Sequence, residues 1–275
     1  MDVAPSAPAP RRAINPRSPH FDFDGVPKHW LGGSAVATHL ANGLNLLFPE
    51  GERFFVRSVH RYLKRIDDPE LRDAVRGFSQ QEGRHANAHE KYFETLEKQG
   101  YEIRGFLRFF SWAAFHVLED AAPPQLRLAV TAAAEHYTAT LAKGALGTPL
   151  FDDADPTMRA LLKWHSVEEV EHKSVAFDVL EHVNSSHRLR VAGMIFASAL
   201  LVSFGIGATA MLLRQDRIPL RRILREIREL GDMNPFGRHV FGSVIRGYMR
   251  RGFHPDQETE DKALASAYLA QVGMA

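Results

Sequence analysis

Two stretches of the sequence place a glutamate three residues before a histidine. They are Glu82–His85 and Glu169–His172. Residues three apart on a helix share a face, so each stretch can present a carboxylate and an imidazole to one point. A single pair of this kind is common on the solvated face of a helix. Two pairs in one chain instead indicate a metal site held between helices.

Two further glutamates lie in apolar stretches of their own. Glu52 comes just before two phenylalanines and a valine, and Glu135 follows three alanines. One Glu from each of two helices, with Glu-x-x-His from each of two others, is the ligand set of ferritin-like dimetal carboxylate proteins. Four carboxylates nearly neutralise two cations, and burying them without metal would be costly. We therefore predict an all-α fold: a ferritin-like four-helix bundle with a dimetal centre, plus extra C-terminal helices.

Three more residues lie at ligand spacing. His165, four residues before Glu169, lies on the same helical stripe and joins the predicted ligands. His89, four residues after His85, can be a further ligand or a partner of one. Glu50 competes with Glu52 for the role of first carboxylate, and we prefer Glu52 because it lies deeper in its predicted helix. The predicted metal ligands are thus Glu52, Glu82, His85, Glu135, His165, Glu169 and His172.

Proline, glycine and acidic residues mark the ends of the helices that must position these side chains. Pro suits the first turn of a helix and Gly its end. We expect helices over 34–66 with a break near 48–51, and then over 69–99, 105–120, 125–146 and 156–183. Long helices joined by short loops are typical of a bundle. We assign this dimetal bundle to residues 21–185.

Composition limits the chemistry. The chain has 275 residues and no cysteine, which excludes thiolate nucleophiles, iron–sulfur clusters and cysteine-based zinc sites. The predicted cofactors are therefore two iron ions, with Mn or Zn as alternatives, held by His and Glu. With 34 basic and 33 acidic residues, nucleic-acid binding is not expected. Residues 1–20 lack an apolar run, so we expect a disordered tail rather than a secretion signal, and a cytoplasmic location.

Residues 186–275 are expected to form an apolar helix and a basic helical region. The run 191–213 is uncharged and long enough to cross a membrane, and arginines flank it on both sides. Three interpretations remain open: a core helix of the bundle or of a homodimer interface, a monotopic membrane attachment, and a true span. The second predicts membrane surface contact through 188–225, peripheral or anchored at the inner face. Further helices are expected over 218–230, 238–251 and 256–271.

The sequence resembles two known groups of proteins. The order Glu52, Glu82-x-x-His85, Glu135, His165-x-x-x-Glu169-x-x-His172 resembles the ligand set of the p-aminobenzoate N-oxygenase group of diiron enzymes. The wider sequence from about residue 21 resembles a bacterial family labelled "predicted metal-dependent hydrolase". That second resemblance is carried by four segments: Phe-Pro-Glu-Gly-Glu-Arg-Phe-Phe from 48, Gln-Glu-x-x-His from 81, Glu-Glu-x-x-His-Lys from 168 and Gly-Phe-His-Pro from 252.

The resemblances and the ligand set imply three competing functions. The first is a diiron oxidoreductase or oxygenase that activates O₂ to oxidise a small organic, even lipid-like, substrate. We favour it because hydrolytic dimetal sites usually mix Asp and His on loops. The alternative is a metal-dependent hydrolase in which the metals lower the pKa of a bound water. The third is a non-enzymatic metal-binding or membrane-associated helical protein.

Overall fold

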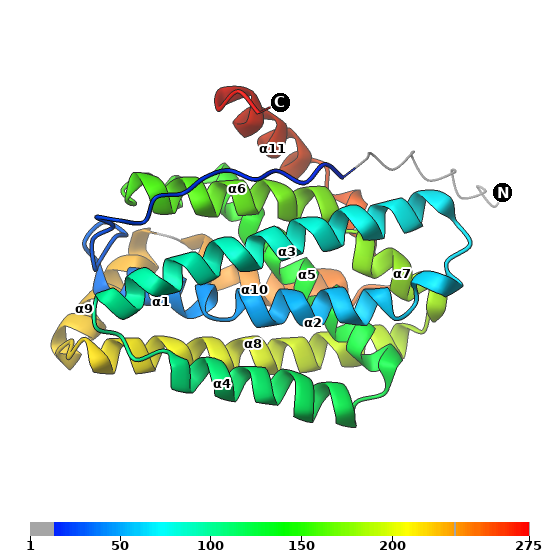
Figure 1. Cartoon of the computed structure of the whole chain (residues 1–275), viewed down its shortest axis with the longest axis horizontal. Helices are drawn as coiled ribbons and strands as arrows, with labels where there is room; N and C mark the ends of the chain where they lie inside the picture. Colours follow the sequence, from blue (N-terminus) through cyan, green and yellow to red (C-terminus); the bar gives the residue numbers. More distant parts are fainter. Residues whose placement is uncertain (1–13, 234, 275) are drawn as a thin grey trace.

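The computed structural model describes residues 14–233 and 235–274, which form helices joined mostly by short connections. Within these residues there is no β-strand, and the only bridge is an isolated pair, Leu31 with Ala154. The all-α prediction is therefore confirmed (Figure 1). The α-helices are α1 (Ala35–Asn45), α2 (Phe48–His60), α3 (Pro69–Lys98), α4 (Arg104–Trp112), α5 (Pro124–Gly147), α6 (Pro156–His172), α7 (Val175–Val183), α8 (His187–Gln215), α9 (Leu220–Met233), α10 (Pro235–Tyr248) and α11 (Glu260–Gln271).

The helix starts follow from local capping chemistry. The Asp68 side chain accepts from the backbone N–H of Glu70, and Asp155 accepts from those of Thr157 and Met158. In both helices Pro occupies the first turn, where its missing N–H costs nothing. Gly100 follows α3 with φ +92°, a conformation that favours glycine. The predicted ends of α3 and the start of α6 are thereby confirmed.

Two predicted helices differ in the structure. The segment 105–120 begins as α4 but continues as a π-helical stretch, Ala113–Glu119. The segment 156–183 is two helices rather than one, because the chain turns at Lys173 and Ser174. There the buried Lys173 ammonium donates to the Asp261 carboxylate and to the carbonyl of Glu258. The turn leaves His172 at the last position of α6.

Helices α2, α3, α5 and α6 surround the centre of the molecule, with α2 packed on α3 and α5 packed on α6. Helix α8 packs along both α5 and α1, and α11 lies against α5 and α6. The apolar core has two main clusters that meet at the centre. Phe78 of one packs on the ring of His172, and Trp164 of the other packs on His85, with ring centroids 5.0 and 4.9 Å apart.

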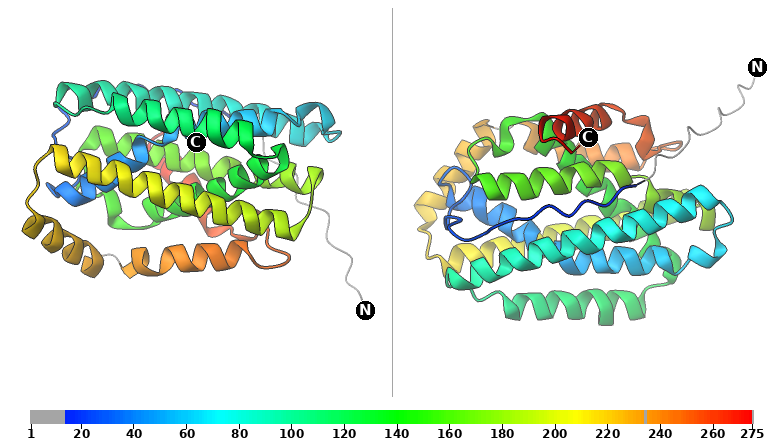
Figure 2. Two further views of the ribbon diagram at one scale, coloured as in Figure 1. Left: turned by 90° about the horizontal axis from the view of Figure 1, so that it is seen from below. Right: turned by 45° about the horizontal axis from the view of Figure 1, so that its top comes forward.

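The tail predicted over residues 1–20 lies outside the described residues up to residue 13. Residues 14–20 are not a free tail, because they run between α3 and α6 and contact both helices (Figure 2, right). Ile14 packs directly on Gly77, where any Cβ would lie 2.6 Å from the Ile14 side chain. Arg17 makes two hydrogen bonds of 2.7 and 2.8 Å to the carboxylate of Glu171. These contacts give a polar segment enough partners to be ordered.

A second His/Asp cluster lies at the C-terminal end of α8. Asp216 is 2.6 Å from the Lys28 ammonium, 2.5 Å from His29 Nε2 and 3.2 Å from His39 Nε2. Burial would raise the pKa of Asp216, but hydrogen bonds from Lys28, His29 and His39 outweigh it and lower that pKa. The histidines and the aspartate are close enough to hold a cation, yet Lys28 already supplies positive charge. We therefore interpret the cluster as a structural contact that holds the N-terminal segment and α1 against the end of α8.

The contact between α8 and α5 is a backbone approach. A Cβ at Gly193 would lie 2.4 Å from the carbonyl oxygen of Ala129, whereas one at Gly207 would meet nothing within 4 Å. We expect Gly193→Ala to push the helices apart and lower the free energy of unfolding by about 1–3 kcal/mol. Gly207→Ala in the same helix should raise it by about 0.5–1 kcal/mol. Urea unfolding of both variants measures this, and equal effects would contradict the close approach.

The Asp216 cluster predicts an acid-sensitive contribution to stability. Because its folded pKa is lowered, the contribution is complete above the unfolded pKa of about 3.9 and is lost as the pH falls toward the folded pKa. Asp216→Asn should therefore destabilise the chain at about pH 5 to 7, and the difference should shrink below about pH 4. Urea unfolding of both proteins across this range is the measurement. A difference that persists undiminished at about pH 3 would rule out the pairing.

Candidate metal centre

Each of the four central helices sends one glutamate into the middle of the bundle. Glu52 lies on α2, Glu82 on α3, Glu135 on α5 and Glu169 on α6. All four are buried, the most exposed at 4%. The three histidines predicted as ligands are equally buried. The structure thus brings the seven predicted side chains together; their binding of metal stays a prediction.

The two Glu-x-x-His pairs face each other across the interface of α3 and α6. Glu82 lies between the two imidazoles: its Oε2 is 3.7 Å from His85 Nδ1, and its Oε1 is 3.6 Å from His172 Nε2. Glu169 Oε1 is likewise 3.9 Å from each of these nitrogens. A carboxylate with an imidazole on either side is suited to hold a metal ion together with them.

The remaining predicted ligands lie on either side of this pair. His165 Nε2 is 2.9 Å from Glu169 Oε1 and 3.5 Å from Glu52 Oε1, and its ring centroid lies 4.1 Å from that of His85. On the other side, Glu135 Oε2 is 3.0 Å from His172 Nδ1, a hydrogen-bonding distance. The cluster therefore has a His85 side with Glu52 and His165, and a His172 side with Glu135.

Of the two additional candidate ligands, His89 lies at the cluster and Glu50 lies outside it. His89 is fully buried, and its Nε2 lies 2.7 Å from His165 Nδ1, so it fixes which nitrogen of His165 faces the carboxylates. Glu50 lies outside the cluster, 2.9 Å from the Arg53 guanidinium and 3.4 Å from the Ser111 hydroxyl. The preference for Glu52 over Glu50 thus agrees with the geometry.

Glu168, which the sequence-based prediction did not include, is fully buried beside the cluster. Its Oε2 accepts from His85 Nε2 at 3.0 Å, and its Oε1 accepts from the backbone N–H of Arg17 at 2.9 Å. This interaction orients the His85 ring with Nδ1 toward Glu82 and Glu169. Two adjacent carboxylates usually indicate a solvated face. The available signal was that Glu168 opens the Glu-Glu-x-x-His-Lys segment by which the sequence resembles the hydrolase family.

The electrostatics of the cluster are those of crowded anions. Burial raises the pKa of Glu52, Glu82 and Glu135 well above the ordinary value, and repulsion among the carboxylates raises it further. Burial would also raise the pKa of Glu169, but the imidazoles of His172 and His165 outweigh it and lower that pKa. Burial lowers the pKa of His85 and the neighbouring imidazoles add to the effect, which leaves it a neutral donor suited to a metal.

Most of the carboxylate oxygens and imidazole nitrogens of the cluster have no hydrogen-bond partner among the described residues, so they are available to bind a cation. Within the described chain, both oxygens of Glu52 and of Glu82 lack a hydrogen-bond partner. The same holds for Glu135 Oε1, Glu169 Oε2, His85 Nδ1 and His172 Nε2. Unpartnered buried carboxylates are costly, and a shared cation satisfies them all at once. Residue types, burial and orientation are those of a site for hard or borderline metal ions.

Aromatic rings close the cluster off from water. Phe48 packs on His89 and His165 with ring centroids 4.9 and 4.8 Å away, and Phe78 covers His172. Trp164 covers His85 and also lines a cavity of about 380 Å³ between the N-terminal segment, the start of α6 and the C-terminal end of α11. That cavity is separated from the cluster by the indole ring.

Comparison with known proteins identifies a family. No curated protein and no solved structure matches the chain. One family does match, over residues 15–259, and it is described as "Predicted metal-dependent hydrolase". The match takes in every residue of the Glu/His cluster. Because it extends over most of its length, the chain belongs to this family of predicted metal-dependent hydrolases.

Proposed function

We propose that the chain is a metal-dependent hydrolase whose Glu/His cluster holds two divalent cations between α2, α3, α5 and α6. The observation that carries the proposal is that buried carboxylate oxygens and imidazole nitrogens, several of them unpartnered, gather in two adjoining groups that could each hold a metal ion. The groups are Glu82, His85, Glu169 and His172, and Glu52, His89 and His165. The family description supports hydrolysis over the oxidation that the ligand pattern alone favoured. A ferritin-like arrangement of the four helices is part of this proposal.

The distances suggest how the ligands would be shared. Glu82 and Glu169, each between His85 and His172, would hold both cations. Glu52 would complete the His85 side together with His165. Glu135 Oε2 accepts from His172 Nδ1, which would keep His172 Nε2 facing Glu82 and Glu169, and the unpartnered Glu135 Oε1 would be the donor on that side. When bound, the cations would lower the pKa of a water molecule and polarise the bond to be cleaved.

The residues around the ligands would set protonation and orientation. Glu168 accepts the Nε2 proton of His85, which keeps the Nδ1 lone pair facing the centre. His89 Nε2 and His165 Nδ1 share a hydrogen bond, which would hold His165 Nε2 facing Glu52 and Glu169. Trp164, between His85 and the 380 Å³ cavity, is placed to admit a small apolar substrate when its ring moves.

A second candidate is oxidation of an organic substrate with O₂ at two iron ions. The specific observation in its favour is the donor set: four glutamates and at least three histidines, all on helices and without aspartate. Carboxylate-rich sites of this kind on bundle helices are typical of diiron proteins. The choice between the two reactions depends on which metal and which co-substrate support turnover.

The two reactions separate by metal and by oxygen. We expect the Zn²⁺- or Mn²⁺-loaded chain to cleave activated ester or phosphoester substrates in the absence of O₂, because hydrolysis needs only a metal-activated water. Glu169→Gln, which removes one shared carboxylate, should abolish this activity. If no metal supports hydrolysis, while the Fe²⁺-loaded chain consumes O₂ with a transient visible absorption, the oxidase is correct and the hydrolase is wrong.

The crowded carboxylates predict opposite effects of one substitution with and without metal. In the metal-free chain, Glu52→Gln should leave the Tm unchanged or raise it, because it removes an acid that burial and repulsion disfavour. With Mn²⁺ or Zn²⁺ at about 100 times the Kd, the parent chain should gain about 2.7 kcal/mol per site, and the variant should lose much of that gain.

Thermal unfolding with and without EDTA gives this comparison. Glu94→Gln on the exposed face of α3 is the matched control and should keep the full metal stabilisation. The proposed ligand role of Glu52 fails if Glu52→Gln retains the metal-induced rise in Tm.

A further inference from the structure

The apolar helix α8 has two different sides. One side packs on α5 and α1 through small residues such as Gly193, Ala197 and Ala208, which are buried. The opposite side carries a stripe of large apolar residues exposed to solvent: Ile195 at 57%, Phe196 at 48%, Val202 at 42% and Ile206 at 63%. The buried side also holds Met194, Leu212 and Leu213, so α8 carries large apolar residues on both sides, which is not the pattern of a helix with one face in water.

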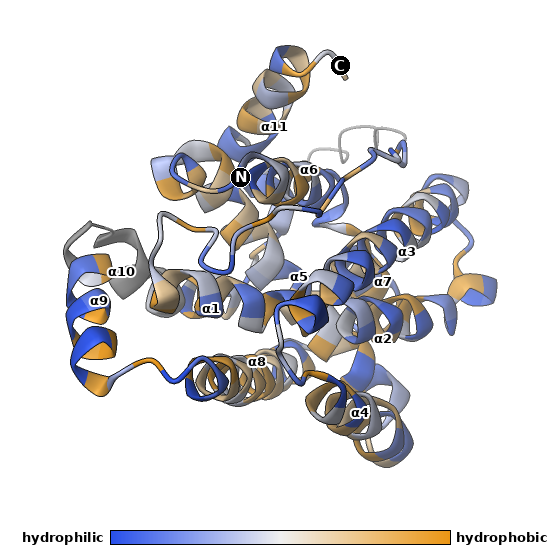
Figure 3. Cartoon of the chain, turned by 60° about the vertical axis from the view of Figure 1, so that its left-hand side comes forward, coloured by the Kyte–Doolittle hydropathy of each residue, from blue (hydrophilic) through white to orange (hydrophobic). Residues whose placement is uncertain are grey.

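Helix α4 extends this apolar surface. Phe204 of α8 packs against Phe106 and Phe110 of α4, with ring centroids 6.4 and 4.8 Å apart. Beside them Phe109 and Trp112 are more than half exposed. Figure 3, coloured by hydropathy, shows α8 and α4 side by side at one edge of the molecule, and Figure 2 (left) looks onto this face.

Helix α9 adds a basic amphipathic element next to the end of α8. Leu220, Leu224 and Ile227 recur at helical spacing and are 68%, 59% and 52% exposed. Arg221, Arg225 and Arg228 lie on the same helix and are also exposed. An exposed apolar stripe flanked by arginines is typical of a helix that lies in a membrane interface.

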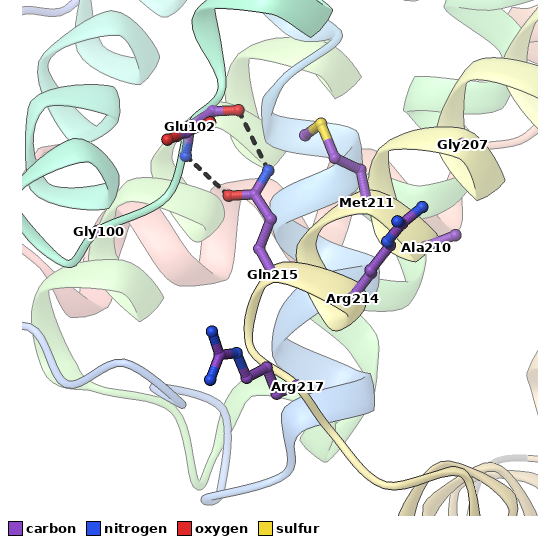
Figure 4. Close-up of a pocket in the computed structure, with 8 residues that line it drawn as sticks. All are labelled: Gly100, Glu102, Gly207, Ala210, Met211, Arg214, Gln215 and Arg217. Atoms are coloured by element: carbon purple, nitrogen blue, oxygen red, sulfur yellow. Dashed lines mark hydrogen bonds between the residues drawn. The ribbon is translucent and has the colours of Figure 1, made fainter.

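Arginines also lie at both ends of the α8 stripe. Arg188 is exposed at its start, and Arg214 and Arg217 line a hollow of about 720 Å³ at its end (Figure 4). The hollow continues the stripe through Gly207 and Ala210, and its one acidic residue is Glu102. Within the described chain, neither Arg214 nor Arg217 forms an ion pair. Free guanidinium groups beside apolar surface suit phosphate headgroups above acyl chains.

We propose that α4, α8 and α9 form a docking surface for an anionic lipid bilayer, on which the chain lies without spanning it. Helix α8 is the one described helix long and apolar enough to cross a membrane, but one side of it is covered by α5 and α1. A second copy of the chain fits this surface less well, because a two-fold contact would bring the arginine-flanked surfaces of both copies together. The proposal does not depend on the hydrolase assignment.

Vesicle co-sedimentation of the full chain tests the docking surface. Vesicles of phosphatidylcholine with about one third phosphatidylglycerol should pellet the chain, and pure phosphatidylcholine vesicles should pellet it less, the difference vanishing at high salt. The double variant Phe109→Glu/Ile206→Glu should bind about tenfold more weakly or worse. Val272→Glu, a 41% exposed apolar residue after α11 on the opposite side, is the matched control and should bind normally.

Trp112 fluorescence gives an independent readout, because the other two tryptophans are buried. Its emission should shift to the blue on the anionic vesicles and be quenched by brominated lipid. Unfolding curves show whether the double variant remains folded. Equal vesicle binding by the double variant and the parent overturns the proposal. A second result also overturns it: the parent chain does not bind vesicles and sediments as a dimer, whereas the double variant is a monomer. That result would assign the surface to a second copy of the chain.

Discussion

The rest of this structure depends on four carboxylates placed side by side where water does not reach. Glu52, Glu82 and Glu135 hold raised pKa values because burial and mutual repulsion oppose their charge. Without a cation, burial favours their protonated forms, in which five of their six carboxyl oxygens lack a hydrogen-bond partner in the described part of the chain, and this lowers the free energy of unfolding. The packing of α2 on α3 and of α5 on α6 therefore brings together groups that repel each other when ionised. In such a bundle the free energy of cation binding contributes directly to the free energy of folding.

A line of polar contacts links this centre to the surface. Arg17 in the N-terminal segment binds Glu168 and Glu171, and Glu168 in turn orients His85. Burial raises the pKa of Glu168 to about 7, and the Arg17 backbone and guanidinium oppose that rise. The segment 14–20 therefore does more than cover apolar surface. It favours the ionised form of Glu168, which accepts from His85 Nε2 and so keeps His85 Nδ1 toward Glu82 and Glu169.

Helical spacing made much of the centre predictable. Glu82 with His85, and His165 with Glu169 and His172, could be put on common faces from their spacing alone, because a helix with a fixed period leaves no other choice. Glu168 could not, since neighbouring residues in a helix point in directions about 100° apart and its partner Arg17 lies 151 residues away in sequence. The turn at Lys173 was also missed, because its cause is the distant Asp261.

The 191–213 run was ambiguous for a different physical reason. Hydropathy records how poorly a segment suits water, but not whether protein or lipid replaces the water. The structure separates the two around α8, since α5 and α1 cover one side of the helix and large apolar side chains on the other side are exposed. Helix α5 connects the two regions: Glu135 on it faces the metal ligands, and Ala129, about two turns earlier, touches Gly193 of α8. Because that contact is between backbones, α5 cannot shift relative to α8 without separating the helices. Helix α5 therefore fixes the position of the proposed lipid-binding surface relative to the proposed metal ligands.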